Sequence, residues 1–183
     1  MFHQVTGTWG APIVARLDPQ ADVLQAIRAV AKANDITSGV VFSIVGALDR
    51  AVLQTFEEGA SKSRAVEIEG PVEAHGGGII GVVDAPLRGG VPFGRGGPTR
   101  GDLPEGYGGY VHGESYVHLH MTVTVGDRTV SGHVMPGCIV RSHHPISHIT
   151  VVIAPIVGVM LKHTTDGTPD AGQVGVYHVL DAV

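Results

Sequence analysis

Residues 117–133 constrain the fold of this chain more than any other stretch, because they consist of two alternating runs joined by a short turn. Apolar and polar side chains alternate over residues 117–125 and again over residues 128–134, as is typical of strands with one buried face. Gly126-Asp127 separates the two runs, and glycine at the first central position suits a two-residue type II′ turn. The stretch therefore predicts a β-hairpin.

The register of this hairpin predicts that three histidines share one face. Counting outward from the turn places Val125 opposite Arg128 and His120 opposite His133. His118 joins the face of His120 because strand side chains repeat every second residue. Three imidazoles about 5 Å apart suit zinc or another divalent ion with coordination positions left open. The alternative interpretation is three ordinary histidines on a half-exposed strand.

The two faces of the hairpin differ in character. The face opposite the histidines is apolar and is expected to pack in the core; it carries Leu119, Met121, Val123, Val130 and Val134. The histidine face is otherwise made of hydroxyl side chains, namely Thr122, Thr124, Thr129 and Ser131. The hairpin thus predicts a boundary between a core and a polar surface.

The whole chain, residues 1–183, is expected to form one domain rich in strands and turns. Hydrophobic residues make up 43% of the 183 residues, charged residues only 16%, and there are 27 glycines. Further strands are expected over residues 11–17, 40–45, 51–56, 65–69, 72–75, 79–83, 149–153, 157–163 and 175–180. The predicted class is α/β or α+β, a largely antiparallel sheet with few helices.

One amphipathic helix is expected after the first strand. Asp18-Pro19 resembles an N-cap followed by proline at the first helical position, and apolar residues then recur at helical spacing to about Asn34. The segment Gly76-Gly77-Gly78 lacks the lysine of a phosphate-binding loop and is expected to permit a bulge or close backbone approach.

Charge and cysteine content limit the function classes. The formal net charge is −5, so a broad nucleic-acid footprint is not expected. The single cysteine, Cys138, excludes an internal disulfide and is interpreted as a small buried hydrophobic side chain. Neither a signal-peptide pattern nor an apolar run of about 20 residues is present, so no membrane contact is expected and a cytoplasmic location is the default.

Two segments are unusual for so short a chain. Residues 84–114 form an insertion rich in glycine, proline and arginine, interpreted either as a lid over a site or as a solvated loop. A second histidine cluster, with His143 and His144, follows the hairpin. We expect the insertion and this cluster to line one pocket with the metal, unless they are an unrelated loop and turn.

Several motifs, in the same order along residues 11–155, make the chain similar to the plant and prokaryote conserved (PPC) domain. They are Arg16-Leu17-Asp18-Pro19, Val45-Gly46-Ala47-Leu48-Asp49-Arg50, His118-Leu119-His120-Met121-Thr122-Val123 and Gly132-His133-Val134-Met135-Pro136-Gly137. Bacteria carry this domain alone, and plants carry it in AT-hook nuclear-localised proteins. The resemblance implies a seven-stranded, mainly antiparallel sheet backed by one main helix and assembled as a homotrimer. Bacterial members with these histidine motifs resemble metal binders.

The first functional hypothesis is a metal-dependent enzyme, with zinc at His118, His120 and His133, acting on a small anionic organic substrate. Such an ion can polarise a carbonyl or generate a bound hydroxide, which suits lyase, hydratase or hydrolase chemistry. The acid–base candidates are Glu114, His75 and Glu73, although Glu114 is also a candidate to orient a ligand histidine. The candidates for substrate binding are Arg16, Arg141, His143 and His144.

Two other hypotheses remain open. The family resemblance favours a DNA-binding or regulatory module without catalysis, whereas the acidic balance and the missing Arg-Gly-Arg-Pro core of an AT-hook disfavour DNA as a partner. A trimeric scaffold whose histidines only pack is the third hypothesis, and it predicts no bound metal.

Overall fold

The protein is described by a computed structural model that covers residues 4–57, 63–84, 113–142, 148–165 and 176–183. The predicted insertion and the second histidine cluster, with His143 and His144, lie outside these residues, apart from Asp84, Gly113 and Glu114 at the ends of the insertion and His148 after the cluster. The elements are β1 (Thr8–Trp9), β2 (Ile13–Leu17), α1 (Val23–Ala33), β3 (Gly39–Phe56), β4 (Ser63–Asp84), β5 (Ser115–Val125), β6 (Arg128–Val134), β7 (Ile139–Val140), β8 (Ile149–Val157), β9 (Val159–Thr165) and β10 (Val176–Ala182).

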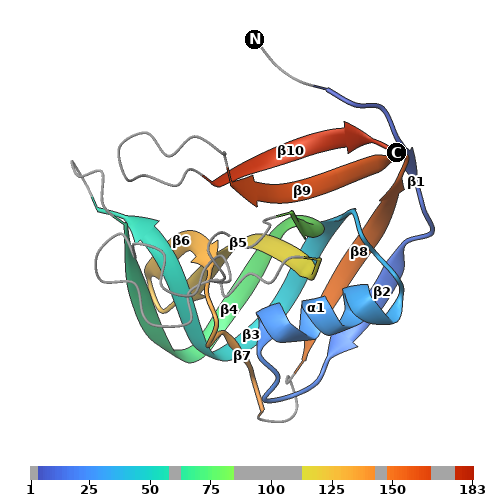
Figure 1. The fold of residues 1–183 in the computed structure, drawn as a ribbon. Helices are drawn as coiled ribbons and strands as arrows, with labels where there is room; N and C mark the ends of the chain where they lie inside the picture. Colours follow the sequence, from blue (N-terminus) through green and yellow to red (C-terminus); the bar gives the residue numbers. More distant parts are fainter. Residues whose placement is uncertain (1–3, 58–62, 85–112, 143–147, 166–175) are drawn as a thin grey trace.

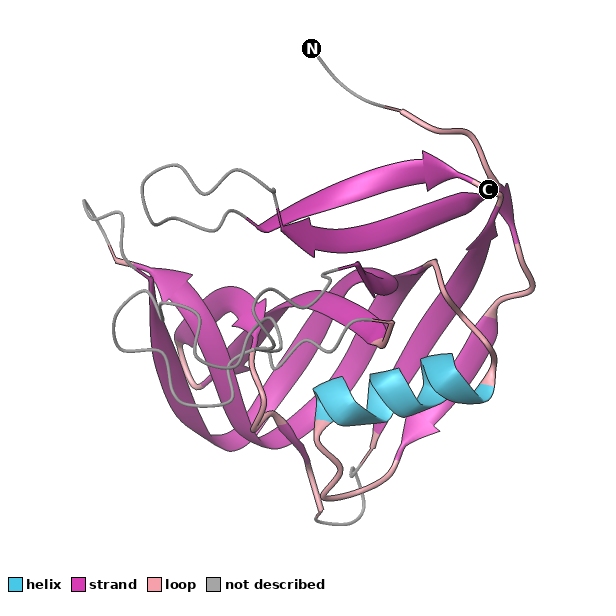
Figure 2. Cartoon of the chain, viewed as in Figure 1, coloured by secondary structure: helices cyan, strands magenta, loops and turns pink. Residues whose placement is uncertain are grey.

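The predicted class is confirmed, since the described residues form a strand-rich α+β fold with a single helix (Figures 1 and 2). The expected number of seven strands is wrong, because the sheet formed by the described residues contains ten. The short strands β1 and β7 each pair over only two residues, which sequence alternation cannot reveal. The pairing is mainly antiparallel as expected, with β4 and β9 parallel.

The sheet folds back on itself around the predicted hairpin. β3 pairs with β4 along most of its length, β4 pairs with β5, β5 with β6, and β6 returns to β3 at Leu53 and Gln54. These four strands therefore form a closed ring of hydrogen-bonded pairs, visible as the curled part of the sheet in Figure 1. β8 extends the sheet from the other end of β3 and carries β1 and β2.

β3 and β4 are longer than the sequence predicts. The expected strands at 40–45 and 51–56 are one strand, and those at 65–69, 72–75 and 79–83 are another. The pairing tolerates the intervening residues through register shifts between Val41 and Ile44 and between Leu48 and Arg50. Such bulges bend a strand without ending it, which lets the long hairpin curl.

α1 begins four residues later than a helix capped at Asp18 would. The N-cap is Asp22, whose Oδ1 accepts a hydrogen bond from the backbone N–H of Gln25 at 3.0 Å. Gln20 has a φ of 67°, a left-handed conformation that turns the chain before the helix. The second carboxylate oxygen of Asp22 accepts from the N–H of Gly137 at 2.6 Å, so the true cap also ties the helix to the sheet.

One apolar cluster fills the space between α1 and the sheet. This cluster includes Val23 and Ile27 of α1, Ile44 and Leu48 of β3, and Leu119 of β5, all of which are fully buried. Figure 2 shows α1 lying against the sheet. With its eleven residues, α1 is too short to cross a membrane, and it is the only helix that the described residues contain.

Candidate metal centre

The histidine hairpin forms as the sequence predicts. β5 and β6 pair with His120 opposite His133 and Val125 opposite Arg128, which confirms the predicted register. Gly126 has a φ of 58°, whereas Asp127 does not have a positive φ, in agreement with the requirement of a type II′ turn for glycine at its first central position. The side chains of His118, His120 and His133 consequently share the face of the hairpin away from the core.

The three imidazoles lie close enough to bind one ion. One nitrogen from each histidine lies within 4.8 Å of the others, and Nε2 of His118 is 3.1 Å from Nε2 of His120. A tetrahedral ion with Zn–N bonds of about 2.0–2.1 Å separates two ligand nitrogens by roughly 3.3 Å. His118 and His120 are already near that separation, and one ring nitrogen of His133 lies within 4.8 Å of both. The donor set fits zinc.

Solvent reaches this cluster from one side. The side chain of His120 is exposed, whereas those of His118 and His133 are half-buried. The ring of His118 stacks on His120 with centroids 5.1 Å apart and meets His133 edge-on at 4.6 Å. The cluster therefore has a packed side and an accessible side, as a metal site with an open coordination position requires.

Tyr116 contacts the cluster from its packed side. Its hydroxyl lies 2.5 Å from Nδ1 of His118, and the two rings meet edge-on with centroids 5.9 Å apart. Only 2% of Tyr116 is exposed. Tyr116 is not among the site residues that the sequence predicts, although the same two-residue repeat that places His118 beside His120 also places Tyr116 on their face.

The glycine run holds the histidine strand close to β4. Gly76 lies opposite Met121, Gly77 opposite His120 and Gly78 opposite Leu119. A Cβ atom at Gly76 would collide with the carbonyl oxygen of His120, and one at Gly78 with that of His118. The predicted close approach of two backbones is confirmed, and it fixes the strand that carries two of the three histidines.

Paired hydroxyl groups continue the same face toward the turn. The hydroxyl oxygens of Thr122 and Ser131 are 2.6 Å apart, and those of Thr124 and Thr129 are 3.1 Å apart. These cross-strand pairs use each other's hydrogen-bonding capacity. Side chains from both strands of the hairpin are therefore hydrogen-bonded to one another across the polar face.

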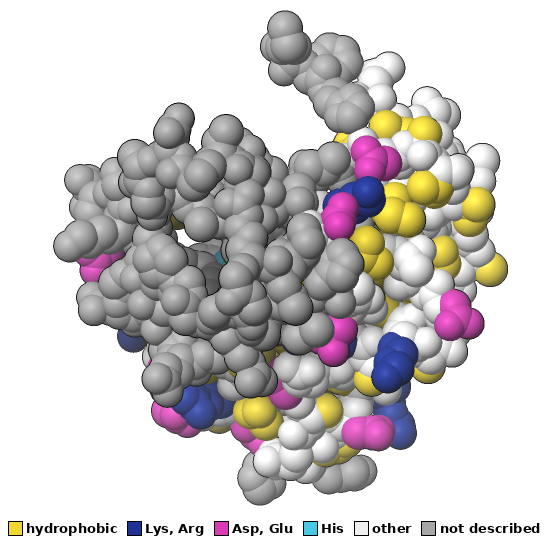
Figure 3. All heavy atoms as spheres, in the orientation of Figure 1, with side chains coloured by type: hydrophobic (Ala, Val, Ile, Leu, Met, Phe, Trp, Pro, Cys, Tyr) yellow, Lys and Arg dark blue, Asp and Glu magenta, His cyan; other side chains and the backbone are white. Residues whose placement is uncertain are grey.

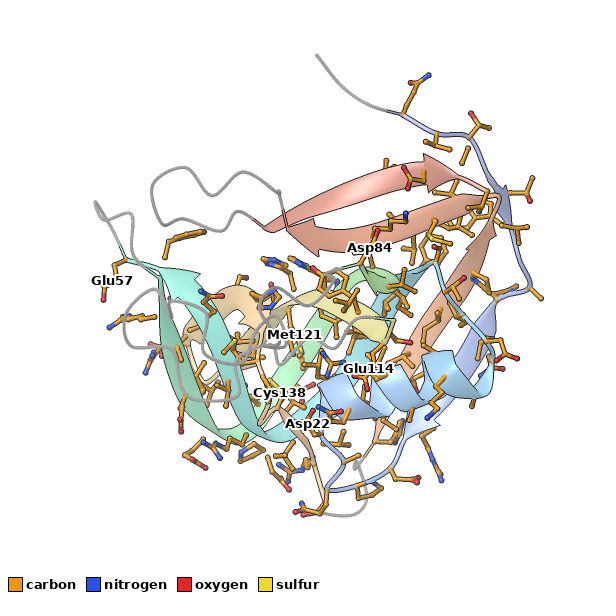
Figure 4. The ribbon with its side chains drawn as sticks, in the orientation of Figure 1. Asp22, Glu57, Asp84, Glu114, Met121 and Cys138 are labelled. Atoms are coloured by element: carbon orange, nitrogen blue, oxygen red, sulfur yellow. The ribbon has the colours of Figure 1, made fainter. Side chains whose placement is uncertain are left out.

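The acid–base candidates divide into two positions. His75 and Glu73 are exposed on β4 opposite Thr122 and Thr124, so they share the histidine face but lie toward the turn. Glu114, labelled in Figure 4, is exposed and precedes β5. Tyr116 lies between it and His118 along the chain. The hydroxyl that contacts the ring of His118 thus belongs to Tyr116, and a catalytic role for Glu114, His75 or Glu73 stays a prediction.

The arginine candidates lie on other strands. Arg16 of β2 is exposed and pairs with Asp18 at 3.8 Å, and β2 lies beyond β8 at the far side of the sheet. Arg141 follows β7, and its backbone N–H donates to the carbonyl of Ala47. On β3, Ala47 is seven residues from Gln54, the residue that pairs with His133. The structure does not bring these two arginines to the histidine cluster.

Cys138 is a core residue, in agreement with the interpretation of its sequence. It is fully buried, and its Sγ donates to the carbonyl of Val52 at 3.3 Å. Burial raises the pKa of the thiol from 9.0 to about 11, so the thiolate that binds metals is disfavoured. Figure 4 shows Cys138 beneath Met121, on the core side of the sheet.

A family model and a solved structure of the same domain family both match this chain. The family model described as the Plants and Prokaryotes Conserved (PCC) domain matches residues 4–89. None of the curated proteins compared with the chain matches its sequence. A plant- and prokaryote-conserved protein from Pyrococcus horikoshii superposes with a TM-score of 0.64 at 14% identity, covering 98% of this chain and 99% of its own.

Two other solved structures differ in what they are said to do. A metal-containing protein from Archaeoglobus fulgidus has a TM-score of 0.66 at 15% identity, with coverage of 96% of this chain and 99% of that one. A candidate DNA-binding protein from Bacteroides thetaiotaomicron has a TM-score of 0.56 at 15% identity, with coverage of 93% and 96%. At such identities these similarities establish the shared fold alone.

Proposed function

We propose that this chain, whose residues 4–89 match the model of the Plants and Prokaryotes Conserved domain, binds one divalent metal ion through His118, His120 and His133, with zinc the best fit. The observation that carries the proposal is the separation of the ligand atoms, all within 4.8 Å on one accessible face. Three imidazoles at this spacing would leave a fourth position for water or a ligand. The metal-containing relative adds support.

Metal content of protein purified without an affinity tag tests this proposal. We expect one equivalent of zinc in the wild type and none in His120→Ala. The matched control is His75→Ala, because His75 is an exposed histidine on the same polar face but outside the triad. Equal loss of metal in both variants, or an empty wild type, would contradict the site.

DNA binding or regulation is better supported as the role of this protein than catalysis is. Two structural neighbours, from Bacteroides thetaiotaomicron and Ralstonia eutropha, are candidate DNA-binding proteins. The enzyme hypothesis from the sequence rests on the metal alone, which when bound would polarise a carbonyl or a water molecule. A metal-dependent lyase or hydrolase acting on a small anionic substrate therefore ranks second.

Any DNA contact would have to be local, because the chain carries a net charge of −5. On the described part of the face in Figure 3, basic side chains form no broad patch and have acidic side chains near them. Binding assays with random and selected duplexes at increasing salt decide between the two roles, since phosphate contacts give a steep salt dependence. Retention of one duplex sequence at physiological salt would establish DNA binding, whereas failure of every duplex would return the enzyme hypothesis to first place.

We also propose that the chain forms a homotrimer through an exposed apolar surface on β1, β2 and β3, the strands that pair with β8. Trp9 and Phe42 lie with ring centroids 5.2 Å apart and are 62% and 55% exposed. Val14 on β2 is 69% exposed and Val45 on β3 is 53% exposed, so large apolar side chains face solvent on neighbouring strands. Such exposure is typical of an interface. Light scattering should give three times the chain mass, and Phe42→Asp should lower it.

A further inference from the structure

Tyr116 is a buried residue whose hydroxyl lies beside one ring nitrogen of His118. Its ring packs with Val83 and Ile79 of β4 in a small apolar cluster of its own. The hydroxyl emerges from this packing 2.5 Å from Nδ1 of His118. With 2% of the residue exposed, water cannot replace that contact freely, so the phenol and the imidazole are constrained partners.

The contact bears on which nitrogen of His118 carries the proton. A neutral imidazole carries one proton, and only its unprotonated nitrogen binds a metal. If Nδ1–H donates to the oxygen of Tyr116, Nε2 is left as the unprotonated atom. That atom is the one that faces Nε2 of His120 at 3.1 Å. Because a phenol oxygen can accept a hydrogen bond, Tyr116 is able to hold His118 in the tautomer that the proposed metal site needs.

The contact between the two histidines is consistent with this assignment. With Nδ1 of His118 protonated, its Nε2 can only accept, so Nε2–H of His120 is the donor in the metal-free protein. Nε2 of His118 is then already unprotonated, whereas exposed His120 must shift its proton from Nε2 to Nδ1 before Nε2 can bind an ion. The two proposed ligands on β5 therefore differ in whether Nε2 carries a proton in the metal-free protein.

We propose that Tyr116 is a positioning residue that presents Nε2 of His118 to the metal; the proposal rests on the proposed metal site. Partners of this kind fix the ring of a ligand histidine and raise its basicity, and their loss typically weakens metal binding about 10–100-fold. Glu114 was the sequence candidate for this task, but the tyrosine hydroxyl occupies the position beside Nδ1.

The first test compares zinc affinity in the wild type, Tyr116→Phe and Thr124→Val. Phenylalanine keeps the buried ring and removes only the hydroxyl, and zinc affinity should fall about 10–100-fold while the stoichiometry stays at one. Thr124→Val is the matched control, because it removes a hydroxyl from the same strand whose partner is Thr129. In the cobalt-substituted protein, the visible absorption bands should shift in Tyr116→Phe and not in the control.

The second test needs no metal. Nitrogen-15 NMR of the histidine rings in the metal-free protein should show His118 protonated at Nδ1, and Tyr116→Phe should add the Nε2-protonated form. Unchanged zinc affinity in Tyr116→Phe, or an Nε2-protonated His118 in the wild type, overturns the proposal. If the wild type bound no zinc, the metal site itself would fail, and the ring tautomer alone would decide whether Tyr116 positions His118.

Discussion

Alternate residues of the same two strands form the two faces of the β5–β6 hairpin, and the two faces lie in different environments. Leu119 and Met121 on one face are fully buried in the main core, whereas His118 and His120 on the other meet solvent or polar partners. The first face is held by many nonspecific contacts and the second by a few specific ones. Mutations on the two faces should therefore affect different properties, stability on one and metal binding on the other.

The largest effect is expected from Leu119→Ala on the core face. Removing a fully buried leucine from a packed core costs about 2–5 kcal/mol of unfolding free energy. Urea denaturation measures this loss. The remaining folded protein should still bind one zinc, because Leu119 points away from the histidines; loss of zinc in proportion to stability would remove the distinction between the faces.

Zinc should stabilise the wild type through the histidine face. At a free zinc concentration one thousand times Kd, binding to the native state alone raises the unfolding free energy by about 4 kcal/mol. His133→Ala should abolish this gain while the metal-free stability changes little, since the face is polar. A thermal shift with and without zinc checks it, and an equal shift in both proteins would mean that zinc binds elsewhere.

The buried side of the sheet should respond to pH through Cys138. Because the folded-state pKa of about 11 lies above 9.0, the native thiol holds its proton where the unfolded one releases it. Stability is therefore full below pH 9 and falls as the pH rises to about 11, by roughly 2–3 kcal/mol. Comparing this slope with that of Cys138→Ser measures it; identical slopes would show that the thiol is not the cause.

The smallest effect is expected from Thr124→Val on the polar face. Its hydroxyl pairs with that of Thr129 at 3.1 Å in a solvent-accessible position, so another polar partner is available in water. The unfolding free energy should change by no more than about 0.5 kcal/mol. Denaturation curves that moved much further would show that the hydroxyl rows contribute to the fold as the core face does.

Local pattern predicted those parts of the molecule that depend on neighbours close in the chain. The hairpin register follows from the turn at Gly126 and a period of two, so the convergence of His118, His120 and His133 could be predicted residue by residue. The buried face and the burial of Cys138 follow from the same alternation and composition. The start of α1 could not be predicted, because Asp22 is preferred over Asp18 through its contact with Gly137, far along the chain.

The sequence by itself determined the hairpin, its two faces and the set of three histidines, because a two-residue turn and strand periodicity leave one register. Only the tertiary structure decided that β3 and β4 run unbroken and curl until β6 meets β3. It also decided that β4 buries Tyr116 with its hydroxyl beside His118, and that Arg16 and Arg141 lie elsewhere. These outcomes depend on packing between segments distant in sequence, where the energy of a contact is set by three-dimensional neighbours and not by local periodicity.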